Sequence, residues 1–266
     1  MEKIDYLIDY LLSENQGIEI QQEPKNLYEK FNLYRSLSNI RPAKEIDEEY
    51  IIRENNFLRE FITENKKITS VGDIETISTS HPASSLKNGD KISLWQGDIT
   101  SLKIGAIVNA ANSRGLGCFV PCHNCIDNQI NTYAGVQLRL ECDKYMKTIN
   151  YNLPTGEAFT TGGYNLPAEH VIHTVGPIIS NEVSEGKKRQ LAKCYVNVLK
   201  QAQENNIKTV AFCCISTGEF RFPKDLACQT ALKTVDDYIS RNRDFFEKII
   251  FNVYGNEDVD IYEKFI

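Results

Sequence analysis

One short segment of this sequence concentrates residues that can bind a metal ion: Cys118, Cys122, His123 and Cys125 lie within eight positions. Thiolate and imidazole ligands at this density suit zinc. Zinc ribbons pair two Cys-x-x-Cys knuckles, and the spacing here differs from that pattern. We therefore predict a Zn²⁺ ion bound by Cys118, His123 and Cys125, a set of three ligands that leaves one coordination position open for chemistry.

The role of Cys122 leaves the number of metal ligands open. As a fourth ligand it would close the coordination sphere and make the metal structural. We favour three ligands because Cys122 and His123 are neighbours in the chain, and neighbouring side chains in an extended turn point apart. A cluster of reduced thiols without metal is the other alternative. The remaining cysteines are expected to be small buried residues: Cys142, Cys194, Cys213, Cys214 and Cys228.

Polar residues follow two apolar segments near this cluster. In WQGDIT, Asp98 can cap a helix, or it can accept a hydrogen bond from an amine such as adenine N6. Asn109 and Asn112 close the next apolar segment, and their amides can bind sugar hydroxyls. Asp127 stands at the expected start of a helix, where the helix dipole favours a carboxylate. Beside a metal ligand, Asp127 can also orient a water or bind a reacting hydroxyl.

The segment ISTGEFRFP offers hydroxyls and backbone amides on a turn that leads into a further helix. Ser216, Thr217 and Gly218 are a candidate cradle for a diphosphate. Phe220 and Phe222 are expected to wall a ribose. The sequence has neither a Walker lysine signature nor a Gly-x-Gly-x-x-Gly motif, so nucleotide hydrolysis and Rossmann chemistry are not indicated.

The elements that position these residues alternate along the chain. Strand-like segments are expected at 91–96, 106–109, 158–162, 171–175, 209–215 and 248–254, and helices at 126–146, 187–205, 224–241 and 257–265. This alternation predicts an α/β fold with three layers, α/β/α, around a mixed, mainly parallel sheet. Ligands of such sheets bind outside the carboxyl ends of the strands, where the three polar loops lie. His173, within a strand, is expected to be a core residue with satisfied hydrogen bonds.

The first part of the chain has a different pattern. Apolar residues recur at helical spacing up to about residue 66, which predicts an N-terminal helical extension over 1–72 without a chemical role. Residues 73–90 are expected to form a linker, and 91–266 the main domain with its inserted zinc loop.

Composition excludes several classes of function. The 266 residues carry a net charge of −6, which argues against wrapping a long nucleic acid, because that needs a basic face. No apolar run is long enough for a membrane span, and the N-terminus lacks the pattern of a secretory signal. We expect a cytoplasmic protein without nucleic-acid or membrane partners.

Five segments together resemble the macrodomain family, whose members bind ADP-ribose: WQGDIT, IVNAANS, IDNQINTYAG, GEAFTTGGYNLPAEHVIHTVGP and ISTGEFRFP. They occur in the order that the family shows, over residues 91–254. Most macrodomains have a glycine run before the helical aspartate, where this chain has CFVPCHNC. With the helical extension, this departure is similar to the zinc-containing bacterial macrodomains, which are protein–ADP-ribose hydrolases associated with sirtuin-class ADP-ribosyltransferases and lipoyl-carrier proteins.

The resemblance assigns roles to individual residues. It implies that Asp98, beside Ile99, binds the adenine amine, that Asn112 faces the distal ribose, and that Asp127, next to Ile126, is the catalytic acid. The residues expected to wrap the diphosphate and distal ribose are Ser216, Thr217, Gly218, Glu219 and Phe220. A carboxylate beside phosphates is repulsive, so the Glu219 side chain should turn outward, or towards the metal and ribose, while its amide serves the phosphate.

The resemblance also implies an activity: zinc-dependent hydrolysis of mono-ADP-ribose from a modified protein side chain, with Asp127 and Asn112 as the catalytic residues. The partner would be an ADP-ribosylated protein, such as a lipoyl-carrier protein modified by a sirtuin-class transferase. The alternative is a non-catalytic module that binds ADP-ribose and contains a structural zinc. A zinc-dependent nucleic-acid binder is disfavoured by the negative net charge.

Overall fold

A six-stranded sheet forms the centre of the computed structural model, which describes residues 3–15, 17–18, 20 and 22–266. Its strands are β2 (Ile92–Gln96), β4 (Ala106–Ala110), β5 (Ala158–Gly162), β6 (His170–Thr174), β7 (Thr209–Phe212) and β8 (Lys248–Val253). They lie in the order β2-β8-β7-β4-β6-β5, and every neighbouring pair is parallel except the antiparallel pair of β5 and β6. The predicted mixed, mainly parallel sheet is confirmed.

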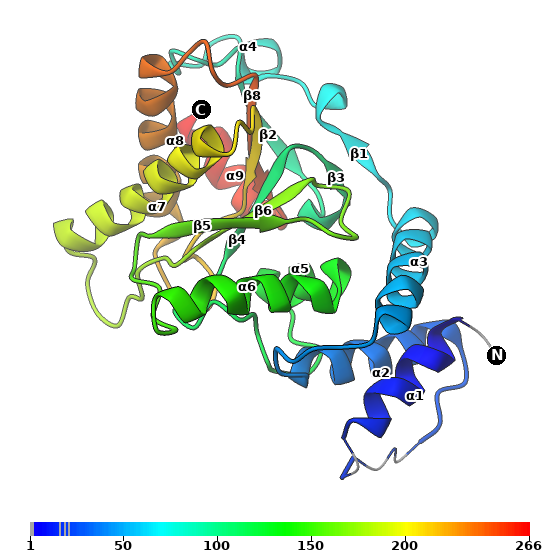
Figure 1. Ribbon diagram of the computed structural model, residues 1–266. Helices are drawn as coiled ribbons and strands as arrows, with labels where there is room; N and C mark the ends of the chain where they lie inside the picture. Colours follow the sequence, from blue (N-terminus) through cyan, green and yellow to red (C-terminus); the bar gives the residue numbers. More distant parts are fainter. Residues whose placement is uncertain (1–2, 16, 19, 21) are drawn as a thin grey trace.

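Helices cover both faces of this sheet (Figure 1). On one face lie α5 (Ile126–Ala134) and α6 (Val136–Thr148), and on the other lie α7 (Glu185–Glu204), α8 (Lys224–Arg241) and α9 (Asn256–Phe265). The central strands β4 and β7 are almost continuously apolar and buried, as strands covered on both faces must be. The predicted three-layer α/β/α fold is confirmed.

Two expected elements differ from the structure. The helix expected over 126–146 is two helices, because Gly135 has a φ of +88° and the Glu54 carboxylate accepts a hydrogen bond from the amide of Val136 at 2.9 Å. A Cβ atom at Gly135 would lie 2.6 Å from that carboxylate, so the break requires glycine. The strand expected over 209–215 ends at Phe212, because the chain leaves the sheet there to form the loop that contains Ser216.

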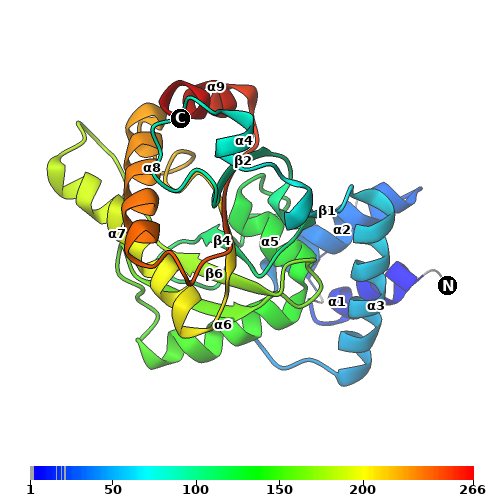
Figure 2. The ribbon, with the colours of Figure 1, turned by 90° about the horizontal axis from the view of Figure 1, so that it is seen from above.

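The N-terminal extension consists of α1 (Lys3–Ser13), α2 (Leu27–Ile40) and α3 (Glu48–Asn65). These helices gather beside one end of α5, away from α7 and α8 (Figure 1 and Figure 2). Their apolar faces form a small core of their own, which Val136 of α6 helps to close. At its centre the buried Glu54 accepts hydrogen bonds from the hydroxyls of Tyr34 and Tyr50 at 2.7 and 3.3 Å.

The segment expected to be a linker is partly ordered into short elements. It contains α4 (Ile77–Ser80) and begins at the end of η1 (Val71–Asp73). Just before it, within the predicted extension, β1 (Thr69–Ser70) pairs with β3 (Leu102–Lys103). Further along, the Asn88 amide donates to the Asp236 carboxylate of α8 at 2.8 Å. The segment is therefore tied to α8, and the division of the chain at residues 72 and 90 stays a prediction.

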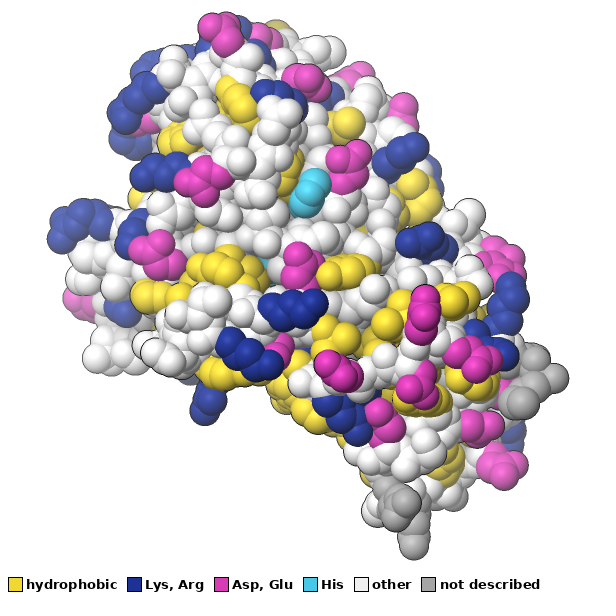
Figure 3. Space-filling view, viewed as in Figure 1, with side chains coloured by type: hydrophobic (Ala, Val, Ile, Leu, Met, Phe, Trp, Pro, Cys, Tyr) yellow, Lys and Arg dark blue, Asp and Glu magenta, His cyan; other side chains and the backbone are white. Residues whose placement is uncertain are grey.

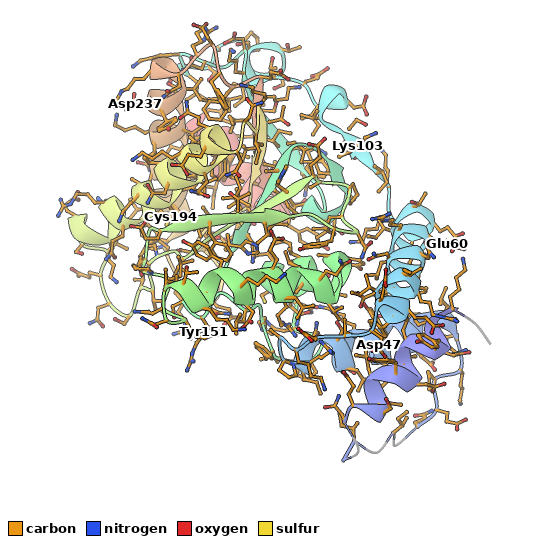
Figure 4. All side chains as sticks on the ribbon, viewed as in Figure 1. Asp47, Glu60, Lys103, Tyr151, Cys194 and Asp237 are labelled. Carbon is orange, nitrogen blue, oxygen red and sulfur yellow. The ribbon has the colours of Figure 1, made fainter. Side chains whose placement is uncertain are left out.

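The dispersed cysteines are mostly core residues. Four of them are 8% exposed or less: Cys142, Cys194, Cys213 and Cys228. Cys194, on α7, donates to the carbonyl of Val175 at 3.4 Å (Figure 4). Cys214 is half-buried.

The outer surface carries both signs of charge. On the face that Figure 3 shows, Lys and Arg side chains are interspersed with Asp and Glu, and the described residues form no continuous basic area there. Within the described part of the chain, no helix combines the length and the apolar character needed to cross a membrane.

Candidate functional site

The predicted metal ligands come together in the loop between β4 and α5. The ligand atoms of Cys118, His123 and Cys125 all lie within 4.8 Å of one another, and Cys118 Sγ is 3.7 Å from His123 Nδ1. Bond lengths of tetrahedral zinc sites place two such ligands about 3.6 to 3.8 Å apart. The donor set and its spacing therefore fit a zinc ion.

Cys122 points away from these three side chains. Its backbone has a φ of +53°, and its Sγ donates to the carbonyl of Asn32 on α2 at 3.4 Å. The structure thus separates Cys122 from its neighbour His123, as expected for adjacent side chains in a turn. This arrangement supports a three-ligand site over a four-ligand one.

The chemistry of Cys125 also favours a bound cation. Burial raises the pKa of its thiol well above the ordinary range; the Asn128 amide, which donates to Cys125 Sγ at 3.4 Å, lowers it, and the nearby Cys118 raises it further. A thiol whose pKa is raised in this way stays protonated unless a positive charge compensates for its ionisation. A divalent metal ion bound by the three side chains would supply that charge.

Asp127 lies in the first turn of α5 and is only 4% exposed. Three asparagine side chains donate to its carboxylate: Asn109 at 2.8 Å and Asn131 at 3.1 Å to Oδ1, and Asn112 at 3.3 Å to Oδ2. Burial raises the pKa of Asp127 to about 6, although the Asn109 hydrogen bond and the Arg139 charge oppose the increase. A carboxyl group with this pKa can exchange a proton near neutral pH.

A buried hydrogen-bond chain supports Asp127 from behind. Asn109 Nδ2 lies 3.1 Å from Nδ1 of His173, and because an amide nitrogen only donates, Nδ1 accepts. The proton of His173 is therefore on Nε2, which donates to Thr161 Oγ1 at 3.0 Å. Burial lowers the pKa of His173 to about 3, so the ring stays neutral. His173 is thus a core residue with satisfied hydrogen bonds, and it orients Asn109 towards Asp127.

Asp98 has a different environment at the end of β2. Its Oδ1 caps η2 (Ile99–Ser101) by accepting from the Thr100 amide at 2.9 Å, and its Oδ2 accepts from Lys66 Nζ at 2.6 Å. Burial alone would raise the pKa of Asp98, but the Lys66 ammonium holds it below its ordinary value. The capping role is therefore real, and the half-exposed carboxylate remains an anion with room for a further donor.

The loop after β7 carries the candidate diphosphate cradle. Ser216 is 6% exposed, has a φ of +68°, and its Oγ finds no hydrogen-bond partner among the described residues. Gly218 is exposed and would leave open space around a Cβ atom. Glu219 is largely exposed and its Oε1 lies 3.8 Å from His123 Nε2, so this loop approaches the metal cluster.

The two phenylalanines of this loop differ. Phe220 is half-buried, and its carbonyl accepts from the Ile179 amide at 2.9 Å. Phe222 is 1% exposed and packs in the core of the main domain. The expectation that Phe222 walls a ribose is therefore wrong, because its side chain is used to fill the core.

Lys66 and Asn131 are site residues that sequence reasoning missed. Lys66 follows α3 in the extension, and its Nζ lies 3.4 Å from the ring centroid of Tyr133 as well as beside Asp98. The only sequence signal for Asn131 is its position one helical turn after Asp127. Nothing in the sequence links Lys66 to Asp98.

Comparison with known proteins agrees with this geometry. A model of the Macro domain family matches residues 108–231. A protein-ADP-ribose hydrolase of Treponema medium is 44% identical over 263 residues, which cover 99% of this chain and 97% of that protein. A protein-ADP-ribose hydrolase of Staphylococcus aureus is 41% identical, over 98% of this chain and 94% of that one.

Solved structures give the same result. A Trypanosoma brucei macrodomain in complex with ADP-ribose superposes with a TM-score of 0.65 at 26% identity, covering 86% of this chain and 94% of that chain. The chain belongs to the macrodomain family.

Proposed function

We propose that this protein is a protein–ADP-ribose hydrolase that removes mono-ADP-ribose from a modified protein side chain and uses a zinc ion bound by Cys118, His123 and Cys125. One observation carries the proposal: the buried Asp127, with a pKa of about 6, lies two residues from a metal ligand. The names of the relatives in Treponema medium and Staphylococcus aureus support hydrolysis. The proposed setting is the cytoplasm, with a modified lipoyl-carrier protein as a candidate substrate.

The three loops define the proposed position of ADP-ribose. Asp98, an anion beside Lys66, accepts from the adenine amine. The unpartnered Ser216 hydroxyl and the backbone of Thr217, Gly218, Glu219 and Phe220 bind the diphosphate and the distal ribose. Asn112 and Asp127 then face the distal ribose, next to the metal cluster.

The proposed reaction breaks the bond between the anomeric carbon of the distal ribose and the side-chain atom that carries it. A water molecule forms a new bond to that carbon as the bond to the side chain breaks. The water gives a proton to the Asp127 carboxylate, which then passes it to the released side chain. Asn112 positions the sugar relative to the carboxylate through its hydrogen bond to Asp127. Zinc, when bound, supplies a Lewis acid that polarises a water or a ribose hydroxyl.

Hydrolysis can be tested with a mono-ADP-ribosylated protein. The purified enzyme is incubated with this substrate, with and without a zinc chelator, and free ADP-ribose is measured. We expect release by the zinc-loaded protein, loss of release after chelation, and recovery when zinc is returned. Release that survives complete metal removal would make zinc structural. Tight ADP-ribose binding without any release would replace the hydrolase by a non-catalytic binding module.

A further inference from the structure

The metal loop is held in place by the N-terminal extension. Three backbone groups between residues 120 and 123 have side-chain partners: the Val120 carbonyl accepts from Asn128 Nδ2 at 2.9 Å, the Cys122 amide donates to Asn39 Oδ1 at 2.9 Å, and the His123 carbonyl accepts from Arg35 Nη2 at 2.7 Å. Arg35 and Asn39 both lie on α2. The backbone that carries His123 is therefore anchored by a helix more than 80 residues away in the chain.

Asn128 joins these anchors to the metal ligands. Its Oδ1 accepts from Arg35 Nη2 at 2.8 Å and Nε at 3.1 Å, and its Nδ2 donates to Asn39 Oδ1 at 3.0 Å. Its backbone amide donates to Cys125 Sγ at 3.4 Å. Asn128 is fully buried, so the network is shielded from water.

The loop depends on such anchors because it has no regular secondary structure between Gly117 and Cys125. Cys122 has a φ of +53°, a conformation that a residue other than glycine seldom adopts in a free chain. A loop that had to order itself around an ion would bind that ion more weakly than a preformed one. Groups that orient metal ligands typically change metal affinity about 10- to 100-fold when they are removed.

We propose that Arg35 and Asn39 are positioning residues for the metal cluster, through which the N-terminal extension sets the affinity and geometry of the metal site. The inference rests on the zinc binding in the proposed function. It gives the extension a role beyond packing, because α2 acts on the backbone of His123 and, through Asn128, on Cys125.

The test compares metal binding by the full-length protein and its variants. Zinc affinity is measured by competition with a chromophoric chelator, and ligand geometry by the absorption spectrum of the cobalt-substituted protein. We expect Arg35→Met to weaken zinc binding about 10- to 100-fold and to change the cobalt spectrum. Arg53→Met is the matched control, because Arg53 belongs to the same extension but pairs with Glu49 and stacks on Tyr6.

A second variant keeps the proposal testable if Arg35→Met fails to fold. Arg35→Lys retains the charge but loses the fork that reaches both His123 and Asn128, so we expect a several-fold loss of zinc affinity. Wild-type affinity and spectrum in a folded Arg35→Met or Arg35→Lys protein would overturn the inference and leave the proposed function intact. Failure of the wild-type protein to bind zinc or cobalt would remove the metal from the proposed function and this inference with it.

Discussion

Asp98 and Asp127 belong to the same candidate site, yet their environments are opposite. Asp98 is half-exposed and pairs with the Lys66 ammonium, whereas Asp127 is buried and receives only neutral amide donors. The pKa of Asp98 is consequently lowered, and that of Asp127 is raised to about 6. Burial together with the charge of the partner decides whether a carboxylate remains a fixed acceptor for a ligand or can exchange a proton.

The largest effect is expected from Asp127→Ala. If Asp127 transfers the proton, the rate of ADP-ribose release should fall on the order of 100- to 10,000-fold. The dissociation constant of ADP-ribose should change only a few-fold, as measured by calorimetry. Asp237→Asn, on α8, is the control and should keep full activity (Figure 4). Unchanged single-turnover release by Asp127→Ala would remove Asp127 from the mechanism.

Asp98→Ala should weaken the binding of ADP-ribose and leave the rate of hydrolysis of bound substrate nearly unchanged. Loss of a hydrogen bond to a charged acceptor costs about 1.5 to 3 kcal/mol, so ADP-ribose affinity should fall about 10- to 100-fold. The turnover number at saturating substrate should stay within a few-fold of wild type, because the proposed binding mode places Asp98 at the adenine and not at the bond that breaks. A large loss of turnover with unchanged affinity would contradict the assignment of the two aspartates.

Titration of the metal-free protein tests the comparison directly. Carboxyl-carbon NMR should show Asp127 titrating with a pKa of about 6, while Asp98 titrates below the ordinary value of an aspartate.

The two pKa shifts have opposite consequences for the free energy of unfolding. The contribution of Asp127 is present below the unfolded pKa of about 3.9 and is lost as pH rises through about 6, which amounts to about 3 kcal/mol. The contribution of Asp98 is present above about 3.9 and is lost as pH falls through its lowered pKa. Similar pKa values for Asp98 and Asp127 would contradict the proposed difference between their environments.

The smallest effect is expected from Lys66→Met. Removing the ammonium should raise the pKa of Asp98 towards that of an ordinary aspartate, and it should change ADP-ribose affinity by a few-fold at most. The neighbouring exposed Lys67 provides the control variant Lys67→Met, which should leave the Asp98 titration unchanged. An unaltered Asp98 titration in Lys66→Met would show that some other group lowers its pKa.

Features that depend on the local pattern of residues could be predicted from the sequence. Apolar strands and amphipathic helices alternate strongly enough to identify the three layers, and the crowding of Cys118, His123 and Cys125 identified a candidate metal cluster. Contacts between distant segments were missed. The break at Gly135 depends on Glu54, and the environment of Asp98 depends on Lys66.

Phe222 illustrates another limit of sequence reasoning. Phe220 and Phe222 are two positions apart in the sequence, and this spacing does not tell which of the two side chains faces the core. Only the tertiary structure shows that Phe222 fills the interior.

The position of β2 at the edge of the sheet, beside β8, has a consequence for the order of folding during synthesis. The Gly97 amide donates to the Val253 carbonyl at 3.0 Å, and the Asn252 side chain donates to the Gly97 carbonyl at 2.9 Å. During synthesis, the loop that carries Asp98 therefore cannot reach its final position until β8, about 150 residues later in the chain, has been made. Residues 106–174, with β4, α5 and β6, can associate earlier. The part of the candidate site that contains Cys118, His123 and Cys125 is therefore expected to form first, and the part around Asp98 last.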